Sequence, residues 1–155
     1  MIEDLEQLVG SAVTEVMTTM MSFKVQPTQE AINFSTGEGH LASAVGFIGK
    51  TTGVVYLYAS DRFARLMTCR LLGLEDSDID GDEMVNDAMG EMANMVVGHI
   101  KSRLVDRGMA CVLTIPSIVR GSNFSIEPVS SAERRVFYFD CDQSRLGVEV
   151  MLKHS

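Results

Sequence analysis

The sequence has few basic residues and few cysteines. Lysine and arginine number 13 against 21 aspartates and glutamates, which gives a net charge of −8 at pH 7. Because nucleic-acid binding depends on basic side chains that neutralise phosphates, this balance argues against DNA or RNA as a partner. Cys69, Cys111 and Cys141 are odd in number and form no C-x-x-C pair. They therefore predict neither a disulfide framework nor a zinc site.

Long apolar runs are also absent. No stretch approaches the roughly 20 apolar residues that a membrane-spanning helix needs, so we expect no membrane segment. The first ten residues, MIEDLEQLVG, carry acidic residues where a secretory signal would carry basic ones. We therefore expect a cytoplasmic protein whose partner is a protein or a small molecule. A chain of 155 residues, 46% of them hydrophobic, fits a single domain at 1–155.

The stretch from residue 82 to about residue 107 predicts a long amphipathic helix. Asp87, Glu91 and Asn94 are spaced to line up along its exposed face, and Gly98 continues this line. Glycine destabilises a helix interior by about 1 kcal/mol relative to alanine, so an ordinary solvated face would not favour it. We interpret these four residues, the polar stripe, as a contact surface. The apolar residues recur at steps of three and four on the opposite face: Val85, Met89, Met92, Val96, Ile100 and Leu104.

A similar helix is predicted over residues 3–21. Its exposed side presents Ser11, Glu15 and Thr18, which repeat the spacing of the polar stripe with a shift of 76 residues (11 to 87, 15 to 91, 18 to 94). Chance similarity between two amphipathic helices is common, so the repeat needs support from the rest of the chain. The predicted buried side consists of Leu5, Leu8, Ala12, Val16 and Met20.

The segments after each long helix follow a common order, a strand and then a hairpin. After the first helix we expect a short strand at 31–34, a hairpin of 41–49 and 53–60 turning at Lys50-Thr51-Thr52, and a helix at 61–73. Ser60 or Asp61 can cap that helix, and Gly73 ends it. After the second long helix we expect a β-like run at 109–115, no clear pattern at 117–131, and a hairpin of 134–142 and 146–154 turning at Gln143-Ser144.

The order helix, strand, hairpin therefore occurs twice. We predict an α/β (α+β) fold, a pseudo-twofold duplicated domain in which two long helices pack on a largely antiparallel sheet. The pseudo-repeats would span about 1–60 and 82–155, linked by the helix at 61–73.

The acidic loop before the second long helix matches a calcium-binding loop only at its start. Asp76, Asp78, Asp80 and Gly81 fit the D-x-D-x-D-G opening of an EF-hand. The match then fails, because Asp87 stands in place of the bidentate glutamate. We interpret the loop as a solvated acidic turn that caps the helix, and we expect no metal site in this chain.

The polar stripe also resembles the signature of a known family. Asp87-x-x-x-Glu91-x-x-Asn94, followed after 21 residues by Pro116, resembles the D/S-x-x-x-E-x-x-N…P pattern of the CheC, CheX and FliY chemotaxis phosphatases. The resemblance covers essentially the whole chain, including the DAMGEMANMVVGHIKS segment and the paired hairpins. With one complete motif and no flagellar switch domain after Ser155, the chain looks most like the CheX-like members.

This resemblance implies a phosphatase that hydrolyses the phosphoaspartate of a phosphorylated CheY-like response regulator. Asn94 would orient the attacking water, and Glu91 would engage the lysine of the receiver domain. Asp87, Gly98 and Pro116 would contribute to partner binding. The Mg²⁺ for the reaction would belong to the receiver domain, so the chain would carry no cofactor of its own. The family also implies a homodimer built through sheet edges.

Two other functions stay open. A non-catalytic adaptor would bind a receiver domain or a signalling scaffold, although retention of both Glu91 and Asn94 argues against it. A structural component of a flagellar or signalling assembly would bind its partner whatever the phosphorylation state. On the first helix, Ser11 and Glu15 fit the family motif but Thr18 stands where asparagine would be needed, which predicts a degenerate second site.

Overall fold

The computed structural model describes residues 4–122 and 133–154. Within them, three α-helices and seven strands follow one another along the chain. The helices are α1 (Leu5–Met21), α2 (Asp61–Leu72) and α3 (Gly81–Asp106), with a 3₁₀ turn, η1, at Asp76–Asp78. The strands are β1 (Val25–Thr28), β2 (Gly39–Gly49), β3 (Thr51–Ser60), β4 (Cys111–Leu113), β5 (Ser117–Ser122), β6 (Glu133–Cys141) and β7 (Ser144–His154).

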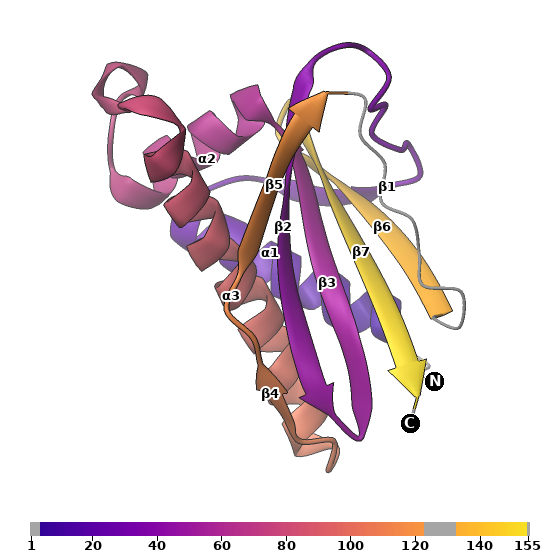
Figure 1. The fold of residues 1–155 in the computed structure, drawn as a ribbon. Coiled ribbons are helices and arrows are strands. Elements are labelled where there is room, and N and C mark those ends of the chain that lie inside the picture. The colour runs from indigo at the N-terminus through magenta and orange to yellow at the C-terminus, as the bar shows by residue number, and fades with distance from the viewer. Residues whose placement is uncertain (1–3, 123–132, 155) are drawn as a thin grey trace.

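The strands form one antiparallel sheet, and the helices cover one of its faces (Figure 1). The strand order is β1-β6-β7-β3-β2-β4, and β5 pairs with β2 beside β4. Alternate residues of the central strands point towards the helices, as expected for a sheet covered on one side. They join the buried faces of all three helices in one core, which includes Met17, Val45, Leu57, Met67, Met89 and Val148. The predicted α+β class is confirmed.

The sheet has a pseudo-twofold strand order. The unit α1, β1, β2, β3 corresponds to the unit α3, β5, β6, β7, and exchanging each strand with its counterpart gives the same order read from the other edge. β3 and β7 pair at the centre, while β2 pairs with β5 and β6 pairs with β1. This order supports the predicted duplication into pseudo-repeats at about 1–60 and 82–155, which itself stays a prediction.

The ends of α2 form as the sequence predicts. The Ser60 side chain accepts a hydrogen bond from the backbone N–H of Phe63 at 3.0 Å, which satisfies one of the free donors of the first turn. Gly73 follows the last turn with φ of +68°, a left-handed conformation that glycine adopts without strain.

The strand predicted at 31–34 is wrong. The strand that follows α1 is β1, which pairs with the last four residues of β6. The apolar residues behind the prediction instead hold a loop against the sheet. Ile32 lies beside Gly147, and the Phe34 ring packs edge-on against Tyr58 with 5.4 Å between the ring centroids. The apolar residues Ile32 and Phe34 therefore reflect burial of side chains and not strand pairing.

The predicted turns of both hairpins are shifted. Thr51 and Thr52 belong to β3 instead of the turn, because β7 extends far enough to pair with both. The second hairpin turns at Asp142 and Gln143, with Asp142 at φ of +55°, and Ser144 already belongs to β7.

The stretch from 109 to 131 also differs in part from the prediction. Strand β4 takes up only the middle of the β-like run at 109–115. Residues 117–122 show no clear sequence pattern. They form β5 because all six of them pair with residues 39–44 of β2. Residues 123–131 lie outside the described part of the chain.

The acidic loop caps itself instead of capping α3. Asp80 precedes α3 but its side chain accepts no capping hydrogen bond, so the predicted side-chain cap is wrong. The Asp78 carboxylate accepts from the backbone N–H of Glu75 at 3.0 Å, which closes η1. Arg65 of α2 binds Asp76 at 3.0 Å and holds this turn beside α2.

The sheet face away from the helices carries all three tyrosines of the sequence. Tyr58 and Tyr138 lie on β3 and β6, on either side of β7, and Tyr56 stacks on Tyr58 with 6.1 Å between the ring centroids. Glu149 is fully buried beneath them. It accepts a hydrogen bond of 2.5 Å from the Tyr58 hydroxyl and pairs with Arg134, so the buried carboxylate is compensated.

Candidate functional site

Helix α3 buries one face and exposes the other. All six apolar residues of the predicted buried face are buried. On the opposite face Asp87 and Glu91 are exposed, while Asn94 and Gly98 are half-buried. Because α3 is one uninterrupted helix of 26 residues, the polar stripe is presented by a single rigid element.

The polar side chains of the stripe have no internal partners. Across residues 4–122 and 133–154, neither Asp87 nor Glu91 forms an ion pair, and the Asn94 carboxamide forms no hydrogen bond. A carboxylate can only accept hydrogen bonds, whereas a carboxamide can both accept and donate them. The stripe therefore offers two different, uncommitted groups within one helical turn of each other.

Pro116 lies directly against α3 near the stripe. A side-chain carbon added to Gly90 would stand 3.5 Å from the proline ring, so ring and helix are in van der Waals range. Gly90 is one turn before Asn94, which places the proline next to the stripe on the side of the sheet edge. At Gly98, by contrast, an added carbon would meet no atom within 4 Å, and the space there is open.

Thr114 positions the loop that carries Pro116, a role that the sequence did not reveal. The backbone N–H of Gly46 donates to Thr114 Oγ1 at 2.8 Å, and the backbone N–H of Thr114 donates to the Gly46 carbonyl at 2.9 Å. These bonds keep the chain attached to β2 across the gap between β4 and β5. The only signal in the sequence is a β-branched residue two places before a proline, which is too common to identify such a role.

Arg120 is a second functional neighbour that sequence reasoning missed. From β5 its guanidinium donates to Asn86 of α3 at 2.6 Å and to Asp61 of α2 at 3.1 Å, and lies 3.7 Å from Asp82. It thus fixes the starts of two helices against one strand. The residue lies in the stretch without a sequence pattern, so nothing pointed to it before β5 was known.

Two hollows flank the polar stripe where the helices meet. The first, which we call the Glu91 hollow, has a volume of about 450 Å³ and includes Asp87 and Glu91. The second, the Asn94 hollow, has a volume of about 420 Å³ and includes Asn94, Gly98 and Glu15. Met20 and Met95 line both, so the hollows adjoin along the stripe.

Met20 is not on the buried side of α1, contrary to the prediction. Its side chain is 45% exposed, whereas the other four residues of that predicted face are buried. Met20 is in the last turn of α1, where the two hollows leave it uncovered. The helical spacing identified the correct face, but it could not show that the covering elements end before the helix does.

The residues of the predicted second site are partly engaged. Arg103 of α3 donates to the Ser11 hydroxyl at 3.4 Å, and the Thr18 hydroxyl donates to the carbonyl of Phe23 at 3.3 Å. Glu15 is exposed and reaches the Asn94 hollow. The sequence predicts two separate stripes, whereas the structure brings Glu15 of one and Asn94 of the other to the same hollow.

An ion pair joins the far ends of α1 and α3. Both terminal guanidinium nitrogens of Arg107 donate to the Asp4 carboxylate, and these hydrogen bonds lower the pKa of Asp4. Asp4 precedes α1 and Arg107 follows α3, so the pair holds the two long helices side by side.

The described residues contain no group of three histidine, cysteine, aspartate or glutamate side chains arranged to hold a metal ion. None of the helices at 4–122 and 133–154 is both long and apolar enough to cross a membrane.

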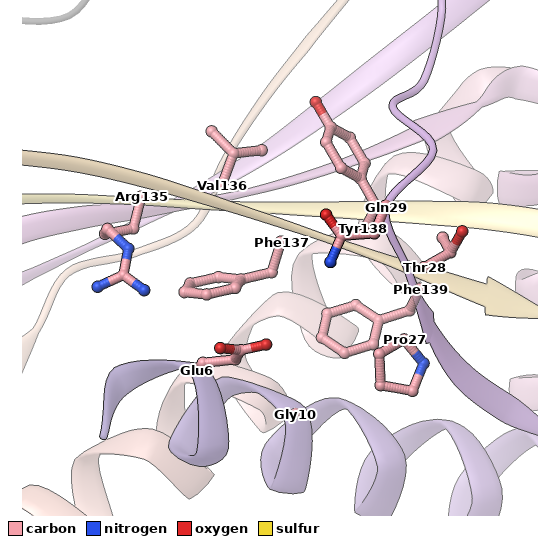
Figure 2. Close-up of a pocket in the computed structure, with 10 residues that line it drawn as sticks. All are labelled: Glu6, Gly10, Pro27, Thr28, Gln29, Arg135, Val136, Phe137, Tyr138 and Phe139. Carbon is pink, nitrogen blue, oxygen red and sulfur yellow. The ribbon is translucent and has the colours of Figure 1, made fainter. Parts of the chain in front are cut away.

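A further hollow, of about 420 Å³, lies between the first half of α1 and β6. Figure 2 shows Glu6 of α1 opposite the rings of Phe137 and Phe139. The Arg135 guanidinium stands 5.3 Å from the centroid of the Phe137 ring. None of the predicted site residues lines this hollow, so it is separate from the polar stripe.

Comparison with known proteins agrees with the fold. A family model described as "Chemotaxis phosphatase CheX" matches residues 41–140, which include the whole polar stripe and Pro116. A curated relative from Thermotoga maritima, described as "CheY-P phosphatase CheX", is 26% identical over 88 residues. That match covers 56% of this chain and 56% of the relative, little more than half the length of each.

Solved structures resemble nearly the whole chain. A chemotaxis protein CheX from Desulfovibrio desulfuricans is 23% identical with a TM-score of 0.81, covering 97% of this chain and 99% of that one. A CheC-like superfamily protein from Shewanella sp. PV-4 is 23% identical with a TM-score of 0.82, covering 99% of both. A chain of the CheX–CheY–BeF₃–Mg²⁺ complex from Borrelia burgdorferi is 18% identical with a TM-score of 0.76, covering 96% and 97%. At these identities the likeness establishes the fold alone.

Proposed function

Because the chain belongs to the CheX family of chemotaxis phosphatases, we propose that it hydrolyses the phosphoaspartate of a CheY-like receiver domain. The curated relative from Thermotoga maritima is described as acting on CheY-P, and the structure from Borrelia burgdorferi is described as a complex with CheY. The observation that carries the proposal is the pair of unbonded groups on one face of α3, Glu91 and Asn94.

The chemistry asks for positioning more than for a strong base. Hydrolysis of an acyl phosphate passes through a loose transition state, so a catalyst gains most by holding water in line with the phosphorus. The Asn94 carboxamide suits this task, because it can accept from a water molecule and donate to a phosphoryl oxygen. We assign Asn94 this role.

Glu91 lies one turn before Asn94 and is exposed. In our proposal its carboxylate binds the lysine of the receiver's phosphorylation site and so fixes the register of the two proteins. A charge-assisted contact of this kind is stronger than a neutral hydrogen bond and weakens as salt is added. Asp87, Gly98 and Pro116 then border the same contact, with Gly98 leaving room for the receiver to approach α3.

The metal ion is part of the partner in this scheme. The receiver would supply Mg²⁺ to neutralise the phosphoryl oxygens from its own side, and this chain would add only the uncharged Asn94 amide and the Glu91 carboxylate.

The direct test is the lifetime of phosphoaspartate on a panel of receiver domains from the source organism. The wild-type protein should shorten the lifetime on at least one receiver. Asn94→Ala should reduce the rate by about 100-fold or more while leaving binding largely intact, since such losses are typical when a transition-state donor is removed. Glu91→Ala should weaken both binding and turnover.

A matched control is Glu83→Ala, which removes the same charge from an exposed position in the first turn of α3. It should change neither receiver binding nor the rate of phosphoaspartate hydrolysis by more than a small factor. Binding without any acceleration by the wild type would favour the adaptor function, and binding that ignores the phosphorylation state would favour a structural component.

We also propose a homodimer and a cytoplasmic location. Ile48 and Val112 face each other across β2 and β4 and are 59% and 69% exposed, and Val119 of β5, which lies opposite Ala42 at the other end of β2, is 51% exposed. No strand of the described chain pairs with the outer edge of β4 or β5. Such an apolar edge favours pairing with a second copy, which sedimentation velocity can measure.

The three unpaired cysteines are compatible with a reducing compartment.

A further inference from the structure

The Glu91 hollow is apolar on its floor although it opens to solvent. Met20 of α1 and Leu72 of α2 are 45% and 50% exposed, and they meet Met84 and Met95 of α3 around the same depression. Three helices therefore contribute large apolar side chains to a surface that nothing in the described chain covers. Exposed apolar side chains gathered in this way commonly mark a contact with another protein.

The charges around the hollow have one sign. Among the residues that line it, Asp87 and Glu91 are the charged ones, and both are exposed carboxylates. Neither is ion-paired within residues 4–122 and 133–154. A complementary surface would therefore combine an apolar side chain with a nearby basic group.

The position of the hollow selects its occupant. Met20 and Met95 line both the Glu91 hollow and the adjoining Asn94 hollow. The apolar floor therefore lies beside both proposed active residues. A receiver domain that places its phosphoaspartate at Asn94 and its lysine at Glu91 would lie over Met20 and Met95, which line the hollows of both residues.

We propose that the Glu91 hollow is a docking pocket for one apolar side chain of the receiver domain, next to the lysine that Glu91 binds, and that Met20 and Leu72 help to determine which receivers are accepted. This inference rests on the proposed function. Methionine suits the role, because its flexible side chain adapts to partners of slightly different shape. The contact is made in the encounter complex and in the transition state alike, so it affects binding more than the chemical step.

The experiment compares binding and turnover in four variants. Met20→Gln and Leu72→Gln keep the side-chain size but remove the apolar contact, whereas Met20→Leu preserves it. Leu66→Gln is the matched control, because Leu66 is 39% exposed on α2 and lines a different depression. Each protein is titrated with CheY-like receivers of the source organism that carry beryllofluoride and Mg²⁺, and its steady-state kcat and KM are measured on the phosphorylated receivers.

We expect Met20→Gln and Leu72→Gln to raise Kd and KM by about 5- to 20-fold, the range of a single apolar contact at an interface, with kcat within about twofold of wild type. Met20→Leu and Leu66→Gln should bind like wild type. Because the altered side chains are only about half-buried, the melting temperature should change little.

Several outcomes would overturn the inference. Wild-type Kd in both glutamine variants would do so while leaving the phosphatase proposal intact, as would a loss of kcat without a change in Kd. Binding that depends on Met20 without any turnover by the wild type would support the pocket and reject the phosphatase. If no receiver bound the wild-type protein, both proposals would be wrong.

Discussion

At the scale of single residues, the structure separates bonded side chains from available ones. Arg65, Arg107 and Arg120 all bind carboxylates of neighbouring elements. Glu91 and Asn94 bind nothing in the described part of the chain, although both sit on a well-packed helix. Asparagine is a mediocre helix former, so an unbonded asparagine in mid-helix does not serve stability. We propose that contact with an external partner accounts for its presence.

Cys141 gives a prediction at the same scale. Burial raises the pKa of its thiol to about 12, well above the value of an exposed cysteine. At pH 8 the thiol should stay protonated and react with a disulfide reagent only when the protein unfolds. Cys69 and Cys111 are half-buried and should react faster. Thiol labelling of native and denatured protein, followed by peptide mapping, measures this difference.

The sign of the pH effect follows from the same shift. A pKa raised by folding stabilises the native state below the unfolded pKa, near 9.0, and this stabilisation is lost as pH rises towards 12. Unfolding free energies of wild type and Cys141→Ala should therefore converge in this alkaline window. Parallel curves across the window, or rapid native labelling of Cys141, would contradict the prediction.

Some of these residues could be recognised from the sequence and others could not. Glu91 and Asn94 were recognisable because helical spacing and a family motif coincide there. Thr114 and Arg120 act through contacts with Gly46 and Asn86, partners 68 and 34 residues away in sequence. Nothing in the spacing of the sequence encodes such pairs. The exposure of Met20 could not be predicted for a related reason, because it depends on where α2 and α3 lie relative to the end of α1.

At the scale of elements, α3 is a stable scaffold that contains glycines in its interior. Gly98 sits in the helix interior with open space beside it. Gly98→Ala should raise the free energy of unfolding by up to about 1 kcal/mol, because alanine is the better helix former and the added carbon meets no atom. Chemical denaturation measures this change.

Gly90→Ala provides the comparison on the same helix. Its added carbon would touch Pro116 at 3.5 Å, so part of the gain in propensity can be lost to adjustment of the loop. We expect a smaller stabilisation than at Gly98. If Gly98→Ala destabilised the protein, the space next to the stripe could not be open.

Element prediction succeeded where periodicity was long and failed where it was short. The three helices and both hairpins have many repeats of their pattern, and the structure places them within a few residues of the prediction. β1 and β5 have only 4 and 6 residues. Strands this short form because a longer partner, β6 or β2, offers an edge, and their own residues carry little signal.

At the scale of the whole molecule, the net charge of −8 has the same sign as the two carboxylates of the polar stripe, so both attract a basic partner surface. A protein with this balance attracts basic surfaces over a distance of about one Debye length, roughly 10 Å at 0.1 M salt. We expect the association rate with a receiver to fall severalfold between 50 and about 300 mM NaCl. The dissociation rate should change less.

Stopped-flow binding at several salt concentrations tests this expectation. Glu91→Gln should reduce the salt dependence, whereas Glu6→Gln, which removes an exposed charge beside the separate hollow of Figure 2, should reduce it less. An association rate independent of salt would mean that docking is dominated by the apolar floor alone.

The placement of the tyrosines leaves the helical face, which carries the polar stripe, without a tyrosine or tryptophan fluorophore. Tyr56, Tyr58 and Tyr138 all lie on the sheet face away from the helices, and the sequence contains no tryptophan. An indole introduced at exposed Thr19, on the rim of the Asn94 hollow, would be the sole tryptophan fluorophore of the chain. Its emission would then report events at the polar stripe in real time, with the native tyrosine signal arising from the far side of the sheet.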